Sequence, residues 1–299
     1  MAESTNDGPP WFAYFPDGSV HLGGVPERLL RHPEMYRRGI NLTDALKPAV
    51  VFRAASDEPA YVVKVLDLDT EELPIYERLL SDIHAPRNHT IPYDIYREGH
   101  PLLIMPYVNT LSSLVEAEDR SPSQLLDILY QLTESVEYLH SLHIAHLDIC
   151  EGNVVAALPN DVQYHPSVVA RKIYVIDFNT SKQLRLGPGV QHAITLPPTQ
   201  IPPPHDLKHF DPYSWDVYCL GRLCRDVIES YSYDGRSVPW IAQWYAQWLL
   251  GEERGCHTAC RCRPTARIAR RLLLVIRLLR SVIELCERVY LWIWKPPTT

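Results

Sequence analysis

One short loop constrains this chain more than any other stretch of its sequence. The loop carries His146-x-Asp148, has Asn153 five residues after the aspartate, and follows an apolar run of helical spacing at 123–140. Phosphoryl transfer needs a carboxylate that orients the accepting hydroxyl, and carboxylate and amide oxygens that hold Mg²⁺. The loop offers one carboxylate and one amide of the kinds that this chemistry requires.

The segment after the loop supplies a second carboxylate. Two β-branched runs, 154–158 and 172–177, are typical of short strands, and the second of them ends on Asp177. The motif H-x-D-x₄-N is moderately specific by itself. Its position between an apolar helix and a β–β–Asp unit adds to that specificity, so these residues together predict a site for phosphate and magnesium.

Composition limits the class of protein. With 299 residues, 46% apolar and 22% charged, the chain can form one large domain or two lobes with an ample core. A net charge of -7 argues against a nucleic-acid partner. The N-terminus lacks the basic and apolar segments of a secretory signal, and seven cysteines, an odd number, predict reduced thiols in a cytoplasmic or nuclear protein.

The first part of the chain predicts a small antiparallel sheet. Two β-rich runs joined by a turn predict a hairpin, and Lys64 lies in the second run. A helical run follows, in which Glu72, or alternatively Glu77, could pair with that lysine; solvated side chains are the ordinary alternative. Two more β-rich runs complete the unit. The strands are expected at 48–54, 60–66, 90–98 and 101–108, and the helix at 70–82.

The order β-β-α-β-β followed by helices predicts an α+β fold, with a small sheet portion before a helical portion. Residues 1–35 are expected to form a leader that docks a few aromatic side chains on the body. After Asp177 the chain is poor in regular structure for about 35 residues, a length that is usually functional in a compact domain. A helix is expected to resume near Asp216.

The C-terminal region predicts one long amphipathic helix, assigned as a separate segment at 271–299. Packing on the body is the favoured interpretation, and a membrane surface or a partner protein is the alternative, because arginines on the helix could face anionic lipid. Charged residues interrupt any apolar run long enough to span a membrane. The heptad-like stripe consists of Ile268, Leu272, Val275, Leu279, Val282, Cys286, Val289 and Ile293.

A group of potential metal ligands precedes this helix. Cys256, His257, Cys260 and Cys262 fall within seven positions. Their spacing lacks the second pair of ligands that structural zinc sites normally show, so a metal site is not favoured there.

Taken together, these motifs resemble the eukaryotic protein kinase domain. Lys64 after two valines, a helix glutamate, the loop at 140–153, IDF at 176–178 and D-x-Y-x-x-G starting at Asp216 occur in that family's order, and RPTA at 263–266 is similar to its late segment. The resemblance implies a two-lobed domain at 36–270, with an N-lobe at 36–108 and a C-lobe at 109–270. The texture is also similar to divergent kinase-like proteins of filamentous and mushroom-forming fungi.

The resemblance implies a role for each matching residue. Asp148 would orient the acceptor hydroxyl, Asp216 would brace the loop, and Phe178 would pack beneath the helix that carries the glutamate. The nucleotide site would consist of Lys64 on the α/β-phosphates of ATP, Glu72 paired with it, Asn153 and Asp177 on Mg²⁺, Met105 as the gatekeeper, and the hinge Pro106 to Val108 against adenine.

Several departures from the family pattern bear on activity. No glycine-rich loop is found at 39–51, Cys150 replaces a lysine that steadies the transferred phosphate, and Leu147 replaces an arginine that binds an activating phosphate. Asn179 replaces a glycine and tolerates positive φ. The motif A-P-E is missing, so its usual partner Arg263 needs another acceptor.

The sequence therefore favours a slow ATP-dependent kinase that acts on Ser or Thr of protein substrates. Losing one positioning group commonly costs about 10²–10³ in rate, which predicts reduced rather than absent activity. A pseudokinase that serves as an interaction module is the main alternative. A small-molecule phosphotransferase shares H-x-D-x₄-N, but the Asp216 helix and RPTA argue against it.

Overall fold

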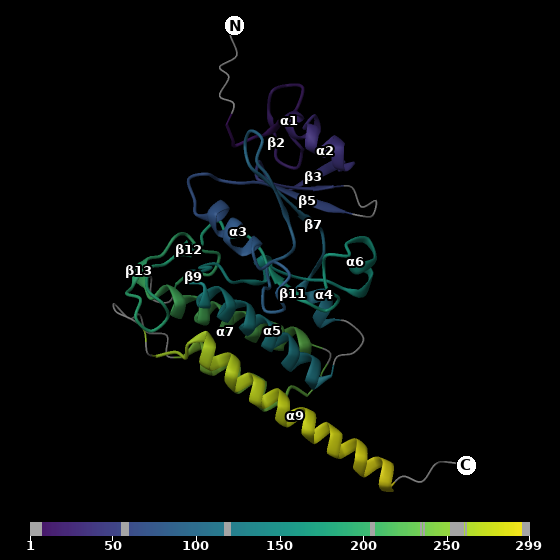
Figure 1. Cartoon of the computed structure of the whole chain (residues 1–299), viewed down its shortest axis with the longest axis vertical. Coiled ribbons are helices and arrows are strands. Elements are labelled where there is room, and N and C mark those ends of the chain that lie inside the picture. The colour runs from purple at the N-terminus through teal and green to yellow at the C-terminus, as the bar shows by residue number, and fades with distance from the viewer. Residues whose placement is uncertain are drawn as a thin grey trace, which may run out of the picture.

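The computed structural model describes residues 8–54, 60–116, 121–203, 207–233, 235, 237–251, 260 and 262–294. The fold is mixed, with small antiparallel sheets and several helices, which agrees with the expected α+β class. Figure 1 shows the largest sheet at the N-terminal end of the molecule, with the long helices gathered at the other end.

The largest sheet has five strands in the order β3-β4-β5-β7-β6. The central strands are mostly apolar and largely buried, as expected for strands covered on both faces. The hairpin expected from the sequence is present as β4 and β5, the two later strands pair as β6 and β7, and β3 adds a strand that the sequence did not predict. The strands are β3 (Leu42–Lys47), β4 (Val51–Ala54), β5 (Tyr61–Val65), β6 (Asp94–Tyr96) and β7 (Leu102–Pro106).

The N-terminal segment covers one face of this sheet. Trp11 is buried there with Leu29 and Met35, while Tyr14 and Phe15 stay exposed, so the expected leader docks through one aromatic residue and two aliphatic ones. The segment consists of β1 (Ala13–Tyr14), β2 (Val20–His21), α1 (Glu27–Leu30) and α2 (Pro33–Arg38). Helix α3 (Glu72–Leu80) packs on the opposite face.

The helical part is built around α5 and α7, whose starts are set by capping side chains. The Ser121 hydroxyl accepts a hydrogen bond from the amide of Gln124, and the Asp211 carboxylate accepts from the amide of Tyr213. Helix α7 consequently begins before Asp216. The helices are α4 (Leu111–Val115), α5 (Pro122–Ser141), α6 (Pro159–Tyr164), α7 (Pro212–Ser232), α8 (Trp240–Leu250) and α9 (Ala266–Trp294).

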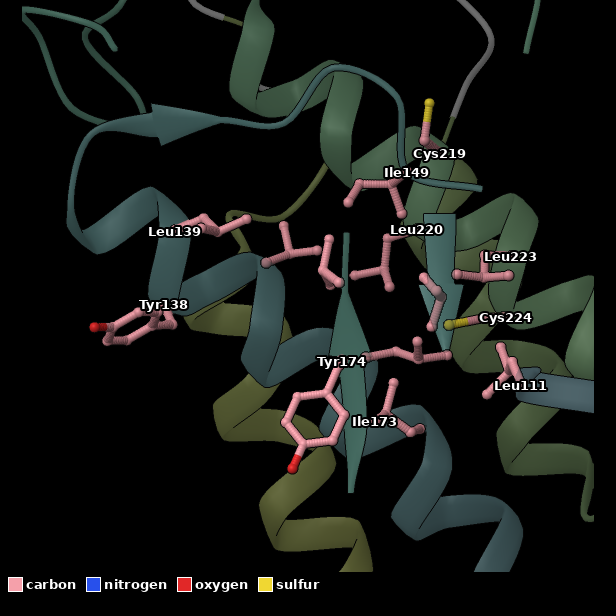
Figure 2. Close-up of a cluster of buried hydrophobic side chains, with 14 of the residues drawn as sticks. Leu111, Tyr138, Leu139, Ile149, Ile173, Tyr174, Cys219, Leu220, Leu223 and Cys224 are labelled. Carbon is pink, nitrogen blue, oxygen red and sulfur yellow. The ribbon is translucent and has the colours of Figure 1, made fainter. Parts of the chain in front are cut away.

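Short strands link these helices, and their side chains join the helical core. Figure 2 shows Ile173 and Tyr174 of β11 among Leu220 and Leu223 of α7 and Leu139 of α5. The strands are β8 (Asn109–Thr110), β9 (Ile144–Ala145), β10 (Val154–Ala156), β11 (Ile173–Val175), β12 (Lys182–Gln183), β13 (Ile194–Thr195) and β14 (His209–Phe210), with one 3₁₀ turn at Glu151–Asn153.

The glycine of the D-x-Y-x-x-G motif permits close packing of α7 on α8. A Cβ atom on Gly221 would lie 2.9 Å from the amide nitrogen of Leu250 and 3.0 Å from the Cβ atom of Leu249. Because backbone cannot yield as a flexible side chain does, this contact requires glycine.

Helix α9 begins at Ala266, five residues before the boundary expected at 271, and lies beside α5 (Figure 1). It packs through Ala269 and Leu273, whereas Val275 and Val282 of the heptad stripe are exposed. The helix therefore packs on the body, as the favoured interpretation expects, but through a face other than the heptad stripe. Within the described residues, no helix combines the length and apolar character needed to cross a bilayer.

The cysteine and histidine group lies only partly in the described residues. Cys256 and His257 fall outside them, whereas Cys260 is buried and Cys262 is exposed. Among the described residues, Cys150, Cys219, Cys224 and Cys286 are free thiols.

Candidate functional site

A buried lysine links the large sheet to α3 and to the end of β11. Alternation along β5 turns Val62 and Lys64 toward α3, and their neighbours toward the opposite face. The Lys64 Nζ atom lies 2.5 Å from Oε1 of Glu72 and 2.6 Å from Oδ1 of Asp177. The lysine is 3% exposed and Glu72 is fully buried, so this pair is held inside the protein rather than solvated.

The structure also decides between the two candidate glutamates. Glu72 in the first turn of α3 meets Lys64, whereas Glu77 lies at the surface, 3.2 Å from the guanidinium of Arg97. The alternative pairing of Lys64 with Glu77 is therefore wrong, because the helix turns that residue away from the sheet.

The buried charges stabilise one another. Burial acts to lower the pKa of Lys64, but the carboxylates of Glu72 and Asp177 outweigh it and raise that pKa above its ordinary value. Burial acts to raise the pKa of Asp177, and the nearby Lys64 ammonium outweighs it and lowers that pKa. Lys64 is thus a fixed cation, and Asp177 a fixed anion, at neutral pH.

Asp148 and Asn153 form a closed pair in the loop after α5. The Asn153 amide nitrogen donates to the Asp148 backbone oxygen at 2.9 Å and to its Oδ2 atom at 3.0 Å. Both residues are largely buried. This pairing leaves the amide oxygen of Asn153 as the atom that could bind a cation.

The same loop is braced from α7. The Asp216 carboxylate, fully buried, accepts the amide of Leu147 at 2.7 Å and the amide of His146 at 2.8 Å, and it lies 3.0 Å from Nε2 of His140. Trp215 donates its indole N–H to the Leu147 carbonyl at 2.8 Å. These contacts agree with the bracing expected of Asp216.

The brace holds a strained backbone in place. Leu147 has φ of 68°, in the left-handed region. This conformation is unfavourable by about 1 kcal/mol or more for any residue other than glycine. Its side chain is fully buried in the core. An arginine at this position would have to bury its charge away from water. The Leu147 position therefore serves packing and offers no cation to an activating phosphate.

The segment at 177–179 packs as expected except at its last residue. The ring of Phe178 meets the rings of Tyr76 on α3, at 5.1 Å between centroids, and of His146, at 5.0 Å. The positive φ of this segment belongs to Asp177, at 63°, and not to Asn179. Position 179 therefore does not depend on the tolerance of asparagine for positive φ.

Two residues that the sequence did not single out enter the site. Lys47, at the end of β3, places its Nζ atom 3.9 Å from Oδ2 of Asp177. Gln200 donates its backbone amide to Oδ1 of Asp148 at 2.8 Å and its side-chain amide to Oδ2 at 3.0 Å. Lys47 could have been suspected from its position in the first hairpin, where a phosphate-covering loop was sought, whereas Gln200 carries no sequence signal.

The remaining departures from the kinase pattern are accommodated locally. Burial and the nearby Asp148 raise the pKa of the Cys150 thiol to about 11, so this side chain is neutral and supplies no charge. Arg263 donates to the Leu250 carbonyl at 2.7 Å and stacks over the rings of Phe210 and Tyr218. A carbonyl oxygen and two aromatic rings thus replace the glutamate of the missing A-P-E motif as partners of Arg263.

The predicted gatekeeper and hinge lie beside the lysine strand. Met105 pairs with Val62 across β7 and β5, and both Met105 and Val108 bury their side chains in the core. A ligand could therefore reach the hinge through its backbone, but not through these two side chains.

The donor set fits Mg²⁺ better than a metal held by protein alone. In the described part of the chain, no group of three or more His, Cys, Asp and Glu side chains could hold a metal ion. Asn153 and Asp177 offer hard oxygen ligands, too few for a closed cage. Mg²⁺ is commonly bound in this way, by one or two protein oxygens completed by water and substrate phosphates.

Comparison with known proteins also indicates a similarity to protein kinases. No known family profile matches the chain. A probable serine/threonine-protein kinase of Dictyostelium discoideum is 30% identical over 129 residues, which cover 42% of this chain and 8% of that protein. A protein of Acanthamoeba polyphaga mimivirus, provisionally named as a serine/threonine-protein kinase, is 26% identical over 205 residues, which cover 62% of this chain and 67% of that protein.

These low-identity similarities indicate a kinase-like domain, with which the mixed fold is compatible. The chain spans only 8% of the length of the Dictyostelium protein. Neither relative is fungal, so the resemblance to fungal proteins gains no support from them.

Proposed function

We propose that this chain is a divergent ATP-dependent protein kinase that transfers phosphate to Ser or Thr hydroxyls of protein substrates. In this proposal, residues 36–108 and 109–270 act as the two lobes of one domain. The observation that carries the proposal is the contact of Lys64 with both Glu72 and Asp177, residues that are far apart in the sequence. No such buried, doubly paired lysine is needed merely to hold a sheet to a helix.

The groups have separate tasks in the proposed reaction. Lys64, fixed by Glu72, binds the phosphates of ATP, and the oxygens of Asn153 and Asp177 hold Mg²⁺, which neutralises charge that develops on the transferred phosphate. Asp148 orients the acceptor hydroxyl and takes its proton. The backbone of the segment Pro106–Val108 meets adenine.

We propose that the enzyme is slow, because positioning groups are missing. Cys150 supplies no charge to the transferred phosphate, and β3 and β4 are joined by a turn without glycine. Lys47 offers a partial substitute, since it extends from that hairpin toward Asp177 and is half exposed. Each lost electrostatic contact commonly costs about 10²–10³ in rate.

A second candidate is a pseudokinase that serves as an interaction module. It is favoured by Gln200, which donates a hydrogen bond to each carboxylate oxygen of Asp148, where an acceptor hydroxyl would have to bind. The two candidate functions differ in whether Gln200 can leave Asp148 so that an acceptor hydroxyl binds there.

Phosphate transfer from ATP to a general acceptor protein such as casein, measured with radiolabelled γ-phosphate and Mg²⁺, tests the proposal. Lys64→Met is expected to lower the rate by about 10²–10³. Because this change leaves Glu72 buried without its partner, the double variant Lys64→Met with Glu72→Gln should fold better and be equally inactive. Unchanged transfer in a folded double variant would refute the assignment of Lys64.

Gln200 is predicted to restrain the reaction. Gln200→Ala removes one of the two hydrogen bonds that Gln200 donates to Asp148, and a hydrogen bond to a charged group contributes about 1.5–3 kcal/mol, so transfer to an added acceptor should rise about tenfold. Gln191→Ala, in the same segment but bonded to the carbonyl of His192, is the matched control and should behave as wild type. A rate that falls in Gln200→Ala would mean that this residue positions Asp148 instead.

A further inference from the structure

Helix α9 has its polarity reversed relative to an ordinary surface helix. The side turned to the body holds Ala269 and Leu273, and most of the helix's charged residues lie outside the opposite face. The side turned away from the body is apolar except for Arg267 and Arg271. A surface helix normally does the opposite, with its apolar stripe on the core.

Polar contacts hold α9 against α5 in antiparallel order. Arg270 lies 3.2 Å from Glu134, and Arg277 lies 2.5 Å from Asp127. One turn earlier on α5 and two turns later on α9, the Ser123 hydroxyl donates to Glu284 at 2.5 Å. Since the numbers rise along α9 as they fall along α5, these contacts fix which side of α9 faces the body.

The outward face of α9 is a wide apolar arc. Its central residues are Val275, Leu278, Leu279, Val282, Leu285 and Val289, whose exposed fractions lie between 47% and 61%. At 3.6 residues per turn, these positions together with Leu274 and Tyr290 cover about 160° of the helix circumference. So much exposed apolar surface on one element marks an interaction site.

The charges on this arc are all positive. Arg267 and Arg271 lie within it and are exposed, whereas the two acidic residues of α9, Glu284 and Glu287, lie outside it. In a coiled coil formed with a second copy, Arg271 would enter the seam opposite an arc that offers no carboxylate. The seam of a two-stranded coil is also narrower than this arc, and Leu274 or Tyr290 would stay in water.

We propose that α9 docks the protein on a membrane surface that contains anionic lipid. The helix lies in the plane of the headgroups with the arc inserted among the acyl chains, while Arg267 and Arg271 pair with lipid phosphates and carboxylates. Its 29 residues make a rod about 43 Å long at one edge of the molecule (Figure 1). The body then sits on the polar side of the helix, which the contacts to α5 already define.

Flotation of the full chain with lipid vesicles tests this proposal independently of phosphate transfer. Wild type should bind vesicles of phosphatidylcholine mixed with phosphatidylserine, bind pure phosphatidylcholine more weakly, and lose the difference at high salt. The double variant Leu278→Glu with Val282→Glu should bind at least about a hundredfold more weakly. Its melting temperature should match that of wild type, because both side chains are already exposed.

A charge-reversal variant separates the electrostatic contribution to vesicle binding from the hydrophobic one. Arg271→Glu should weaken binding to the phosphatidylserine vesicles about fivefold or more and leave binding to phosphatidylcholine unchanged. Arg225→Glu, an exposed arginine on α7, is the matched control and should bind as wild type. Light scattering without lipid should give a monomer.

Two results would overturn the proposal. One is a wild-type chain that binds neither kind of vesicle. The other is a dimer in light scattering that the Leu278 and Val282 changes abolish while vesicle binding is missing, which would assign the arc to a second copy of the chain.

Discussion

Replacing Asp148 by asparagine should lower phosphate transfer by about 10³–10⁴ while Mg²⁺-dependent ATP binding persists. In the proposed reaction this carboxylate accepts the proton of the acceptor hydroxyl, and it is largely buried among the donors of Asn153 and Gln200. An asparagine of nearly the same shape keeps the packing but cannot take the proton. The change therefore separates chemistry from nucleotide binding.

Single-turnover transfer to an acceptor protein and the ATP-induced rise in melting temperature should be measured on the same preparation. Asp226→Asn, an exposed aspartate on α7, is the matched control and should leave both quantities unchanged. Transfer by Asp148→Asn within tenfold of wild type would show that another group accepts the proton, and the loop assignment would then be wrong.

The change of Asp216 to alanine should have the largest effect on stability. It removes the acceptor of the amides of His146 and Leu147, both inside the protein, and leaves Leu147 in a strained conformation with one contact fewer. It also takes away the partner of His140. Breaking such a buried network typically lowers the free energy of unfolding by about 3–5 kcal/mol.

Urea denaturation followed by circular dichroism measures this loss directly. Asp216→Asn is a second variant, which keeps one acceptor oxygen and is expected to lose less stability, so the ranking stays testable if the alanine variant does not fold. A loss below about 1 kcal/mol for the alanine variant would contradict the bracing role, because one ordinary neutral hydrogen bond accounts for that much.

Short-range motifs explain why part of the site could be predicted. Asp148 and Asn153 share one turn of chain, and the spacing fixes their contact whatever the rest of the fold does. Lys64 could be placed mainly by order, because it follows two valines in a predicted hairpin strand and precedes the helix glutamate and the loop motif as in the kinase family. To choose Glu72 over Glu77, one must know which side of α3 faces the sheet. The spacing of apolar residues does not determine this.

Contacts between distant segments could not be predicted. Gln200 reaches Asp148 from a proline-rich stretch that has no periodicity, so nothing in its neighbourhood signals the approach. Lys47 reaches Asp177 only because β3 joins the sheet edge, and that strand is held by its pairing with β4 rather than by a β-rich sequence.

The face through which α9 packs could not be predicted for a different reason. Its heptad stripe is real, and the expectation that an apolar stripe faces the core is sound for most helices. Here the acidic side chains of α5, among them Glu134 and Asp127, pair with the arginines of α9 and turn the stripe outward. Periodicity within one helix contains no information about charges on its neighbour.

A thermal-shift titration of the wild-type chain with ATP, with and without Mg²⁺, tests the central claim most directly. Ligand that binds only the folded state raises the melting temperature by mass action. We predict a rise with ATP that is larger with Mg²⁺ present, and no such Mg²⁺-dependent rise for Asp177→Asn. The absence of any shift at millimolar ATP and Mg²⁺ would contradict the nucleotide site formed by Lys64, Asn153 and Asp177.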